Sequence, residues 1–249
     1  MKILAIDTAT EACSAALYID DAGNTDDTKN KNISSRYQLA PREHSRLILK
    51  MIDELLAQAE LSVDRLDAIA FGQGPGSFMG LRIAAGVVQG IAFAHDIPVI
   101  PVSTLKATAQ RAYEDTGSQN VIAAIDARMD EVYWAAYSLK QNRWHLHGEE
   151  SVISPDKVTL PELPEQSGEP GVSNNWAGAG TGWASYEDRL LRAVDCQLPM
   201  ILTDCFPSAE AIVKLAVDEL KSGNTVTAAG AIPVYIRNDV AKKPKPVKL

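Results

Sequence analysis

The segment ILAIDTATEACSAALYI, residues 3–19, carries the pattern on which the fold prediction depends. A short apolar run ends at Asp7, a polar stretch follows, and apolar residues resume over 12–19. Two short apolar runs separated by a polar turn are typical of paired β-strands. We therefore expect an antiparallel hairpin with a carboxylate at its tip.

The same pattern recurs in the second half of the chain at one fixed offset. The sequence AID at 124–126 repeats AID at 5–7, and Tyr137 then matches Tyr18. Two short apolar strands can be alike by chance, but the shared Asp and Tyr favour a duplicated fold. Two related lobes that each begin with an acid-tipped hairpin are the arrangement of the actin-like ATPases, in which the two turns face each other across a nucleotide-binding cleft.

Around the hairpins, strand and helix patterns alternate, which predicts an α/β fold. The expected strands are 3–7, 12–19, 33–39, 68–72, 98–102, 121–126, 131–139, 144–152, 176–179 and 234–237. The expected helices are 42–60, 78–94, 104–114 with Ser103 as its N-cap, 184–193 and 208–220. The polar stretch 20–31 and the proline-bearing stretch 154–171 are expected to be loops.

Length and composition indicate a two-lobed cytoplasmic protein. The chain has 249 residues, of which 46% are hydrophobic, enough for two cores without disulfides or metals. Its three cysteines are scattered and form no CxxC pair, which fits a reducing compartment. The apolar run at the N-terminus is too short for a signal peptide, and the expected helix 78–94 is shorter than the ~20 residues that cross a bilayer. We interpret that helix as buried and expect no membrane contact.

The charge distribution argues against a large nucleic-acid surface on this chain. The net charge is −8, and an acidic protein repels phosphates at long range. The exception is the tail, 239–249, which carries four lysines. A solvated chain end is the favoured interpretation of the tail, and an RNA-contacting segment is the alternative. We therefore expect any RNA contact to come through a partner.

The two hairpin tips are the candidates for nucleotide binding. Asp7 and Thr8 could hold a hydrated magnesium ion and phosphate oxygens, with Asp126 opposite. Gly180, between a strand and a helix, could cradle an anion. The competing explanation is that Asp, Thr and Gly are ordinary turn residues, and none of the four is a firm assignment. The stretch 73–77 is glycine-rich but has no lysine, so it is not a P-loop.

The helix 78–94 has glycines where helices rarely tolerate them. Gly86 and Gly90 lie four residues apart, as do Gly80 and Ala84, which leaves one helix face nearly smooth. Glycine inside a helix costs roughly 0.8–1 kcal/mol relative to alanine. Packing within the lobe would explain these residues, but we favour an interface with another protein.

The inventory for catalysis is poor. The chain has four histidines, His44, His95, His145 and His147, in no HExxH or HxxxH arrangement, and no GxSxG motif. We therefore expect no catalytic residues, no metal site and no cofactor of its own.

Four sequence blocks give the chain a family resemblance. They are IDTAT at 6–10, PREHS at 41–45, GPGSFMGLR at 74–82 and AIDAR at 124–128. Together they closely resemble the TsaB (YeaZ) family, over residues 1 to about 238. Two departures are Met79, where the family usually has Thr, and the acidic insertion 20–31, which is not a family hallmark.

The resemblance implies a two-lobed actin-like (ASKHA, ribonuclease H-like) fold with duplicated lobes. On that basis we divide the chain into an N-terminal lobe with the interface helices, 1–104, a C-terminal lobe, 105–238, and the tail, 239–249. It also implies a supporting subunit that works with a catalytic paralogue, TsaD, and an ATPase, TsaE, to place threonylcarbamoyl on the adenosine next to the anticodon of tRNAs reading ANN codons.

In that family the two helices after the early strands pair with the catalytic subunit, or with a second copy in a homodimer. ATP or ADP would then lie at the junction with the partner, and tRNA would be met only through the complex. His44 stands alone where the catalytic paralogue has its HxxxH metal pair. The interface residues expected from the resemblance are His44, Leu47, Ile48, Met51, Leu55, Met79, Ile83, Gly86, Val87 and Gly90. The alternative function is an autonomous ATPase or small-molecule kinase that uses Asp7 and Asp126.

Overall fold

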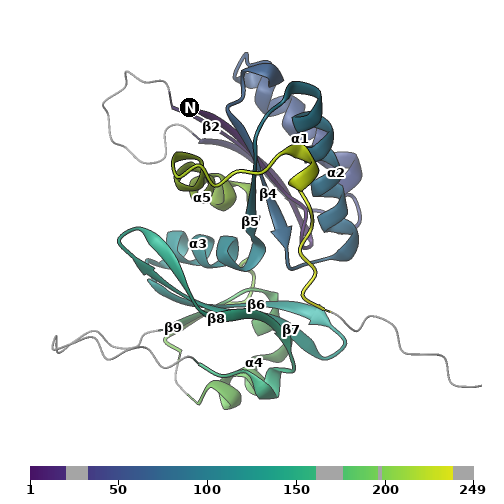
Figure 1. The fold of residues 1–249 in the computed structure, drawn as a ribbon. Helices are drawn as coiled ribbons and strands as arrows, with labels where there is room; N and C mark the ends of the chain where they lie inside the picture. Colours follow the sequence, from purple (N-terminus) through teal and green to yellow (C-terminus); the bar gives the residue numbers. More distant parts are fainter. Residues whose placement is uncertain (21–32, 161–175, 196–197, 238–249) are drawn as a thin grey trace, which may run out of the picture.

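The computed structural model describes residues 1–20, 33–160, 176–195 and 198–237. Most of the predicted loop 20–31, the greater part of the proline-bearing stretch 154–171, and the basic tail lie outside these residues. The described residues form two five-stranded sheets, one above the other in Figure 1.

The first sheet is built from the N-terminal part of the chain. Its strands are β1 (Lys2–Asp7), β2 (Ala12–Ile19), β3 (Ile33–Leu39), β4 (Ala68–Gly74) and β5 (Val99–Ser103), in the order β3-β2-β1-β4-β5. β1 pairs antiparallel with β2 and parallel with β4. The predicted acid-tipped hairpin is therefore present at the centre of the sheet.

The second sheet repeats this plan. Its strands are β6 (Asn120–Arg128), β7 (Glu131–Lys140), β8 (Arg143–Ile153), β9 (Trp176–Ala179) and β10 (Met200–Leu202), in the order β10-β9-β6-β7-β8. Read from β8, each strand stands where its counterpart stands in the first sheet. β6 pairs antiparallel with β7 and parallel with β9, as β1 does with β2 and β4. The duplication predicted from two AID motifs is confirmed by the topology.

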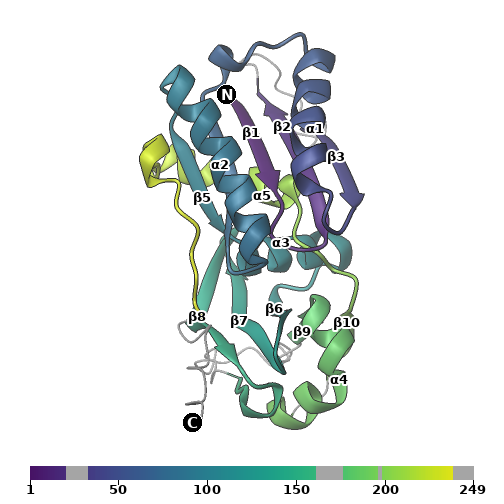
Figure 2. The ribbon, with the colours of Figure 1, turned by 90° about the vertical axis from the view of Figure 1, so that its right-hand side faces the viewer.

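In the described ranges, five α-helices cover the two sheets. They are α1 (His44–Gln58), α2 (Phe78–His95), α3 (Thr104–Thr116), α4 (Thr181–Val194) and α5 (Ala209–Lys221), with short 3₁₀ turns η1 (Val63–Arg65), η2 (Pro155–Lys157) and η3 (Ala228–Gly230). α1 and α2 lie side by side on one face of the first sheet (Figure 2), and α4 lies on the outer face of the second. α3 and α5 pack against each other between the sheets (Figure 1).

The two inner helices do not follow the order of the chain. α3 follows β5 but buries Leu105, Ala109 and Ala112 in the core of the second sheet. α5 follows β10 but buries Ile212 and its neighbours against the first sheet. The predicted unit 105–238 therefore supplies a helix to the first sheet.

The segment after η3 also returns to the first sheet and then runs down to the second (Figure 1). The predicted strand 234–237 is wrong, because this segment makes one sheet-like bond, from Val234 N to Gln73 O at 2.7 Å, and no ladder. β10 was not predicted, since three residues are too few to show a strand period.

The helix starts follow the expected capping chemistry. Ser77, Ser103 and Ser208 each accept a hydrogen bond from a backbone N–H in the first turn of α2, α3 and α5. α2 is long and apolar enough to cross a membrane by length and composition alone. It lies against β4 as one layer of the first lobe, and only a third of its most apolar window is buried. The prediction of a buried helix therefore holds only for the face of α2 that packs on the first sheet.

Candidate functional site

The exposed face of α2 is the first functional feature. The helix buries Leu81, Ala85 and Val88 in the core of the first lobe. On the opposite side, Met79 is 62% exposed and Phe93 is 84% exposed. Large apolar side chains with such exposure on one face of a helix are typical of a surface that meets another protein.

A stripe of small and apolar residues runs along this face. We name it the α2 stripe, and its members are Met79, Ile83, Gly86, Gly90 and Phe93. Their spacing alternates between four and three residues, so they form one seam on the helix. A Cβ atom added to Gly86 or Gly90 would meet nothing within 4 Å. A second backbone can therefore approach this part of the helix closely.

The structure narrows the predicted interface. His44, Ile48, Met51 and Leu55 of α1 are at most 7% exposed, because they are the face of α1 that packs on the first sheet. In this structure these side chains pack beneath the predicted interface and are not exposed to a partner. Leu47, Ile83 and Val87 are half-buried, whereas Met79, Gly86 and Gly90 are exposed.

Gly80 also proves to be an internal packing residue. A Cβ atom there would lie 1.9 Å from the carbonyl oxygen of Thr8. The hairpin tip of the first lobe therefore rests directly on the first turn of α2. Thr8 Oγ1 completes the contact by donating to Gly80 O at 2.7 Å. Met79, next to it, carries no capping role, because Ser77 caps the helix and the Met79 side chain is exposed.

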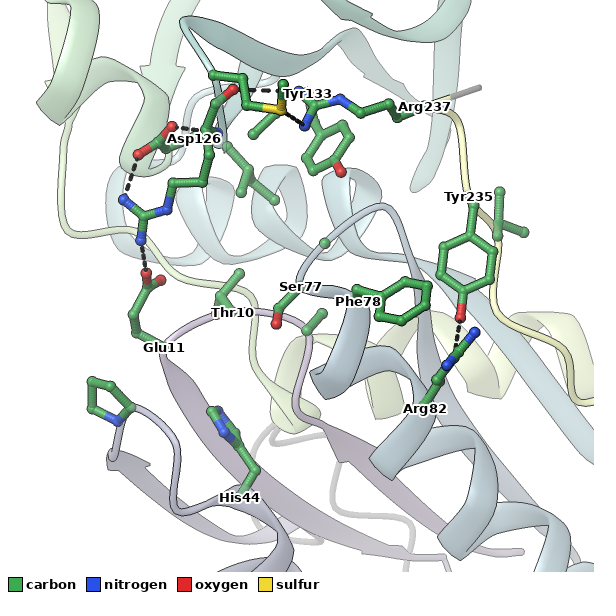
Figure 3. A pocket seen from close by; sticks show the side chains of 18 of the residues that line it. Thr10, Glu11, His44, Ser77, Phe78, Arg82, Asp126, Tyr133, Tyr235 and Arg237 are labelled. Atoms are coloured by element: carbon green, nitrogen blue, oxygen red, sulfur yellow. Dashed lines mark hydrogen bonds and ion pairs between the residues drawn. The ribbon is translucent and has the colours of Figure 1, made fainter. Parts of the chain in front are cut away.

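A cleft between the lobes is the second functional feature, drawn in Figure 3. Its volume is about 960 Å³. The first lobe contributes the hairpin turn with Thr10 and Glu11 and the start of α2 with Phe78. The second lobe contributes Asp126 and the β6–β7 turn, and the C-terminal segment closes one side with Tyr235.

Asp7 does not face this cleft. Its side chain is completely buried and lies against Gly72, where an added Cβ would be 2.1 Å from Asp7 Oδ1. Burial raises the pKa of Asp7 to about 7, and the backbone N–H of Ala9 partly opposes this rise. Oδ1 has no hydrogen-bond partner among the described residues. This geometry does not present Asp7 to magnesium, and Thr8 is likewise turned toward α2.

Asp126 does reach the cleft, but it is already paired. Arg128 Nη1 donates to Asp126 Oδ2 at 2.9 Å, and Arg128 Nη2 donates to Glu11 Oε1 at 2.9 Å (Figure 3). One guanidinium therefore spans the gap between the two hairpin turns. Gly180 does not line the cleft. Its φ is 112°, and a Cβ atom added to it would lie 2.3 Å from the carbonyl oxygen of Ala124. This is close strand-to-turn packing, which explains the glycine without a phosphate.

The histidines do not converge. His44 lines the cleft, and His147 Nε2 lies 2.8 Å from Ser138 Oγ on the far sheet. Within the described ranges, no group of three His, Cys, Asp or Glu side chains is placed to hold a metal ion.

Comparison with known proteins identifies the family to which the chain belongs. A family model described as "TsaD: tRNA N6-adenosine threonylcarbamoyltransferase" matches residues 31–245. The "tRNA threonylcarbamoyladenosine biosynthesis protein TsaB" of Escherichia coli K12 is 40% identical over 252 residues, with both chains fully covered. The chain belongs to the TsaB (YeaZ) family. The TsaB protein of Haemophilus influenzae is 38% identical, covering 99% of this chain and 98% of its own.

Solved structures of the family agree with the fold. "YeaZ from Pseudomonas aeruginosa" is 42% identical and superposes with a TM-score of 0.80, covering 94% of this chain and 99% of the other. The TsaB resemblance seen in the sequence motifs and the duplicated actin-like fold are both confirmed.

Sequence reasoning missed several residues of these two features. Phe93 continues the α2 stripe, and its spacing from Gly86 and Gly90 could have revealed it. The cleft residues Tyr235 and Arg237 were assigned to a strand. No local pattern marks them, because their position depends on the path of the C-terminal segment between the lobes.

Proposed function

We propose that this chain is the non-catalytic partner subunit in tRNA threonylcarbamoyladenosine biosynthesis, acting by binding and activating a TsaD-like catalytic subunit together with a TsaE-like ATPase. The observation that carries the proposal is the α2 stripe, an exposed seam of small and apolar residues on a TsaB-family fold. Burial of such a seam by a related helix would exclude water from Met79 and Phe93 and allow close backbone contact at the glycines.

The site chemistry supports a supporting role. Asp7 is buried, Asp126 is held by Arg128, and His44 stands without a second histidine. These residues give an autonomous ATPase or kinase no exposed carboxylate pair with which to hold magnesium nucleotide. ATP or ADP would bind at the junction with the partner, and tRNA would be contacted through the complex, since the chain itself carries a net charge of −8.

The experiment is reconstitution of tRNA modification from purified components. The TsaD-like and TsaE-like subunits, with ATP and the threonylcarbamoyl donor, are incubated with tRNA in the presence and absence of this chain. We expect modified adenosine only when the chain is present. A Phe93→Asp variant should lose complex formation and modification together, while Lys221→Leu, an exposed residue of α5, serves as the matched surface control.

Two results would contradict the proposal. The first is full modification without this chain. The second is ATP turnover by the isolated chain that Asp7→Ala abolishes, which would support the autonomous enzyme instead.

A further inference from the structure

The two ends of the interlobe cleft have different chemistry. At one end, Arg128 joins Asp126 to Glu11 and so crosses the space between the hairpin turns. The other end is lined by the aromatic rings of Phe78 and Tyr235, with Arg82 beside them (Figure 3). The proposed role as a partner subunit does not explain why Phe78, Tyr235 and Arg82 are gathered at this second end.

The rings and the guanidinium form an ordered cluster. The Phe78 and Tyr235 ring centroids are 5.5 Å apart. The Arg82 Cζ atom lies 3.7 Å from the centroid of the Phe78 ring, and Arg82 Nε donates to the Tyr235 hydroxyl at 3.1 Å. The guanidinium is therefore held in a fixed orientation by stacking and by one hydrogen bond, with its two terminal nitrogens left over.

The cleft is locally positive in an acidic protein. Its lining includes four arginines but only two carboxylates, whereas the whole chain has a net charge of −8. Arg128 and Arg237 are neutralised by Glu11, Asp126 and Glu131. Arg82 and Arg42 have no carboxylate within ion-pairing distance in the part of the chain that the structure describes. An unpaired, oriented guanidinium in a concave wall is suited to bind an anion.

An unsatisfied polar group also lines this cavity, on the side where Glu11 lies (Figure 3). His44 is 7% exposed, and its Nε2 has no hydrogen-bond partner among the described residues. Buried polar groups are nearly always paired in a filled core, so an unpaired one in a cavity wall is typical of a site that takes a ligand. The volume of about 960 Å³ is within the range of small-molecule sites.

We propose that the interlobe cleft binds a small organic monoanion, with a planar apolar body against Phe78 and Tyr235 and a single carboxylate at the Arg82 guanidinium. The same geometry disfavours a nucleotide triphosphate, because the Phe78–Tyr235 end offers one oriented guanidinium, which matches a single carboxylate and not a chain of phosphates. Phe78 and Arg82 lie on α2, but no member of the α2 stripe lines this site, so the proposal goes beyond the proposed function.

Ligand-observed and protein-observed NMR test the proposal with the full chain. The probes are 2-naphthoate, its neutral counterpart 2-naphthylmethanol, and magnesium ATP. We expect 2-naphthoate to shift the amide signals of Phe78 and Tyr235 and of Met129, which lines the cleft from the β6–β7 turn. It should bind at least tenfold more tightly than the alcohol. The variant Arg82→Gln should weaken 2-naphthoate binding by about tenfold, the effect of losing one charged pair.

Arg46→Gln is the matched control, since Arg46 is an exposed arginine of α1 that does not line the cleft. It should bind 2-naphthoate as the unaltered chain does. Equal affinity for acid and alcohol, shifts confined to the α2 stripe, or no binding at millimolar concentration would each overturn the proposal. Tighter binding of ATP than of 2-naphthoate would overturn it as well.

Discussion

Arg128 of the second lobe donates to Glu11 of the first at 2.9 Å, and this contact joins the two hairpin tips that the sequence repeat first identified. Both side chains are substantially exposed, at 72% and 40%. The contact spans the gap between the two tips, yet its exposure limits how much it stabilises the fold.

A double-mutant cycle of Glu11→Gln and Arg128→Met measures this bridge. We expect a coupling free energy of about 0.2–1 kcal/mol, as for other exposed ion pairs, falling further at high salt. Urea denaturation of the four proteins gives the value. A coupling of several kcal/mol would mean that the bridge is a major stabilising contact between the lobes.

Replacement of Asp7 by Asn should change how stability depends on pH. Burial raises the pKa of Asp7 from 3.8 to about 7, so the folded chain keeps a proton that the unfolded chain releases. The unfolded state binds fewer protons in this window, and the free energy of unfolding therefore falls as the pH rises from about 4 to about 7. The favourable contribution of protonated Asp7 to the free energy of unfolding is fully present below about pH 4. It is lost as the pH rises through about 7, and the loss is on the order of 4 kcal/mol.

Asn cannot ionise, so the free energy of unfolding of the Asp7→Asn variant should not show this fall with pH. The stability of the variant relative to the unaltered chain should therefore improve as the pH rises. Denaturant unfolding at a series of pH values measures the slope. Asp53→Asn, at an exposed carboxylate of α1, is the matched Asp-to-Asn control. Parallel slopes for Asp7→Asn and the unaltered chain would show that Asp7 is already ionised in the folded state.

Two glycines of α2 should respond in opposite ways to alanine. Gly80→Ala places a methyl group on the Thr8 carbonyl and should destabilise the chain by at least about 1–3 kcal/mol. Gly86→Ala meets open space and should stabilise the monomer by up to about 1 kcal/mol through higher helix propensity. Urea denaturation at low protein concentration compares them, and similar changes in both would argue against the close contact between the hairpin tip and α2.

Self-association of the isolated chain should depend on the α2 stripe. We expect a homodimer at micromolar concentration, and we expect Gly90→Leu to weaken it at least tenfold, because the larger side chain holds two backbones apart. The monomer should not be destabilised and should gain up to about 1 kcal/mol, because a Cβ atom at Gly90 would meet nothing within 4 Å and Leu has the higher helix propensity. Sedimentation velocity measures the association, with Lys221→Leu as the control. Unchanged assembly of Gly90→Leu would exclude the stripe as the contact.

The sequence predicted the architecture well because its evidence was periodic. The AID repeat located both central strands, and the apolar spacing in 42–60 located α1. The interface prediction for α1 came from the family resemblance, which identifies the helix but not which of its faces is exposed. Ile48 and Leu55 belong to the apolar face, which is buried. Their burial against the sheet could be assigned only once α1 was packed.

The sequence predicted a cleft between the two hairpin tips, but its wall of Phe78, Arg82 and Tyr235 was beyond sequence reasoning for a different reason. Arg82 and Tyr235 lie far apart in the chain, and no local pattern pairs them. Asp7 has the residue type of a magnesium ligand. Its carboxylate can point inward because Gly72, on the neighbouring strand β4, has no side chain to fill that space. Such contacts depend on tertiary packing, so they appear only in the folded chain.

The exchange of α3 and α5 between the sheets has a consequence for how the molecule is made. The inner face of each sheet is covered mainly by a helix from the other half of the polypeptide. When only the first half has emerged from the ribosome, the inner face of the first sheet therefore lacks α5 and is exposed. Cutting the chain in the turn after Thr116 should yield fragments that are insoluble apart and that recover a native spectrum when mixed.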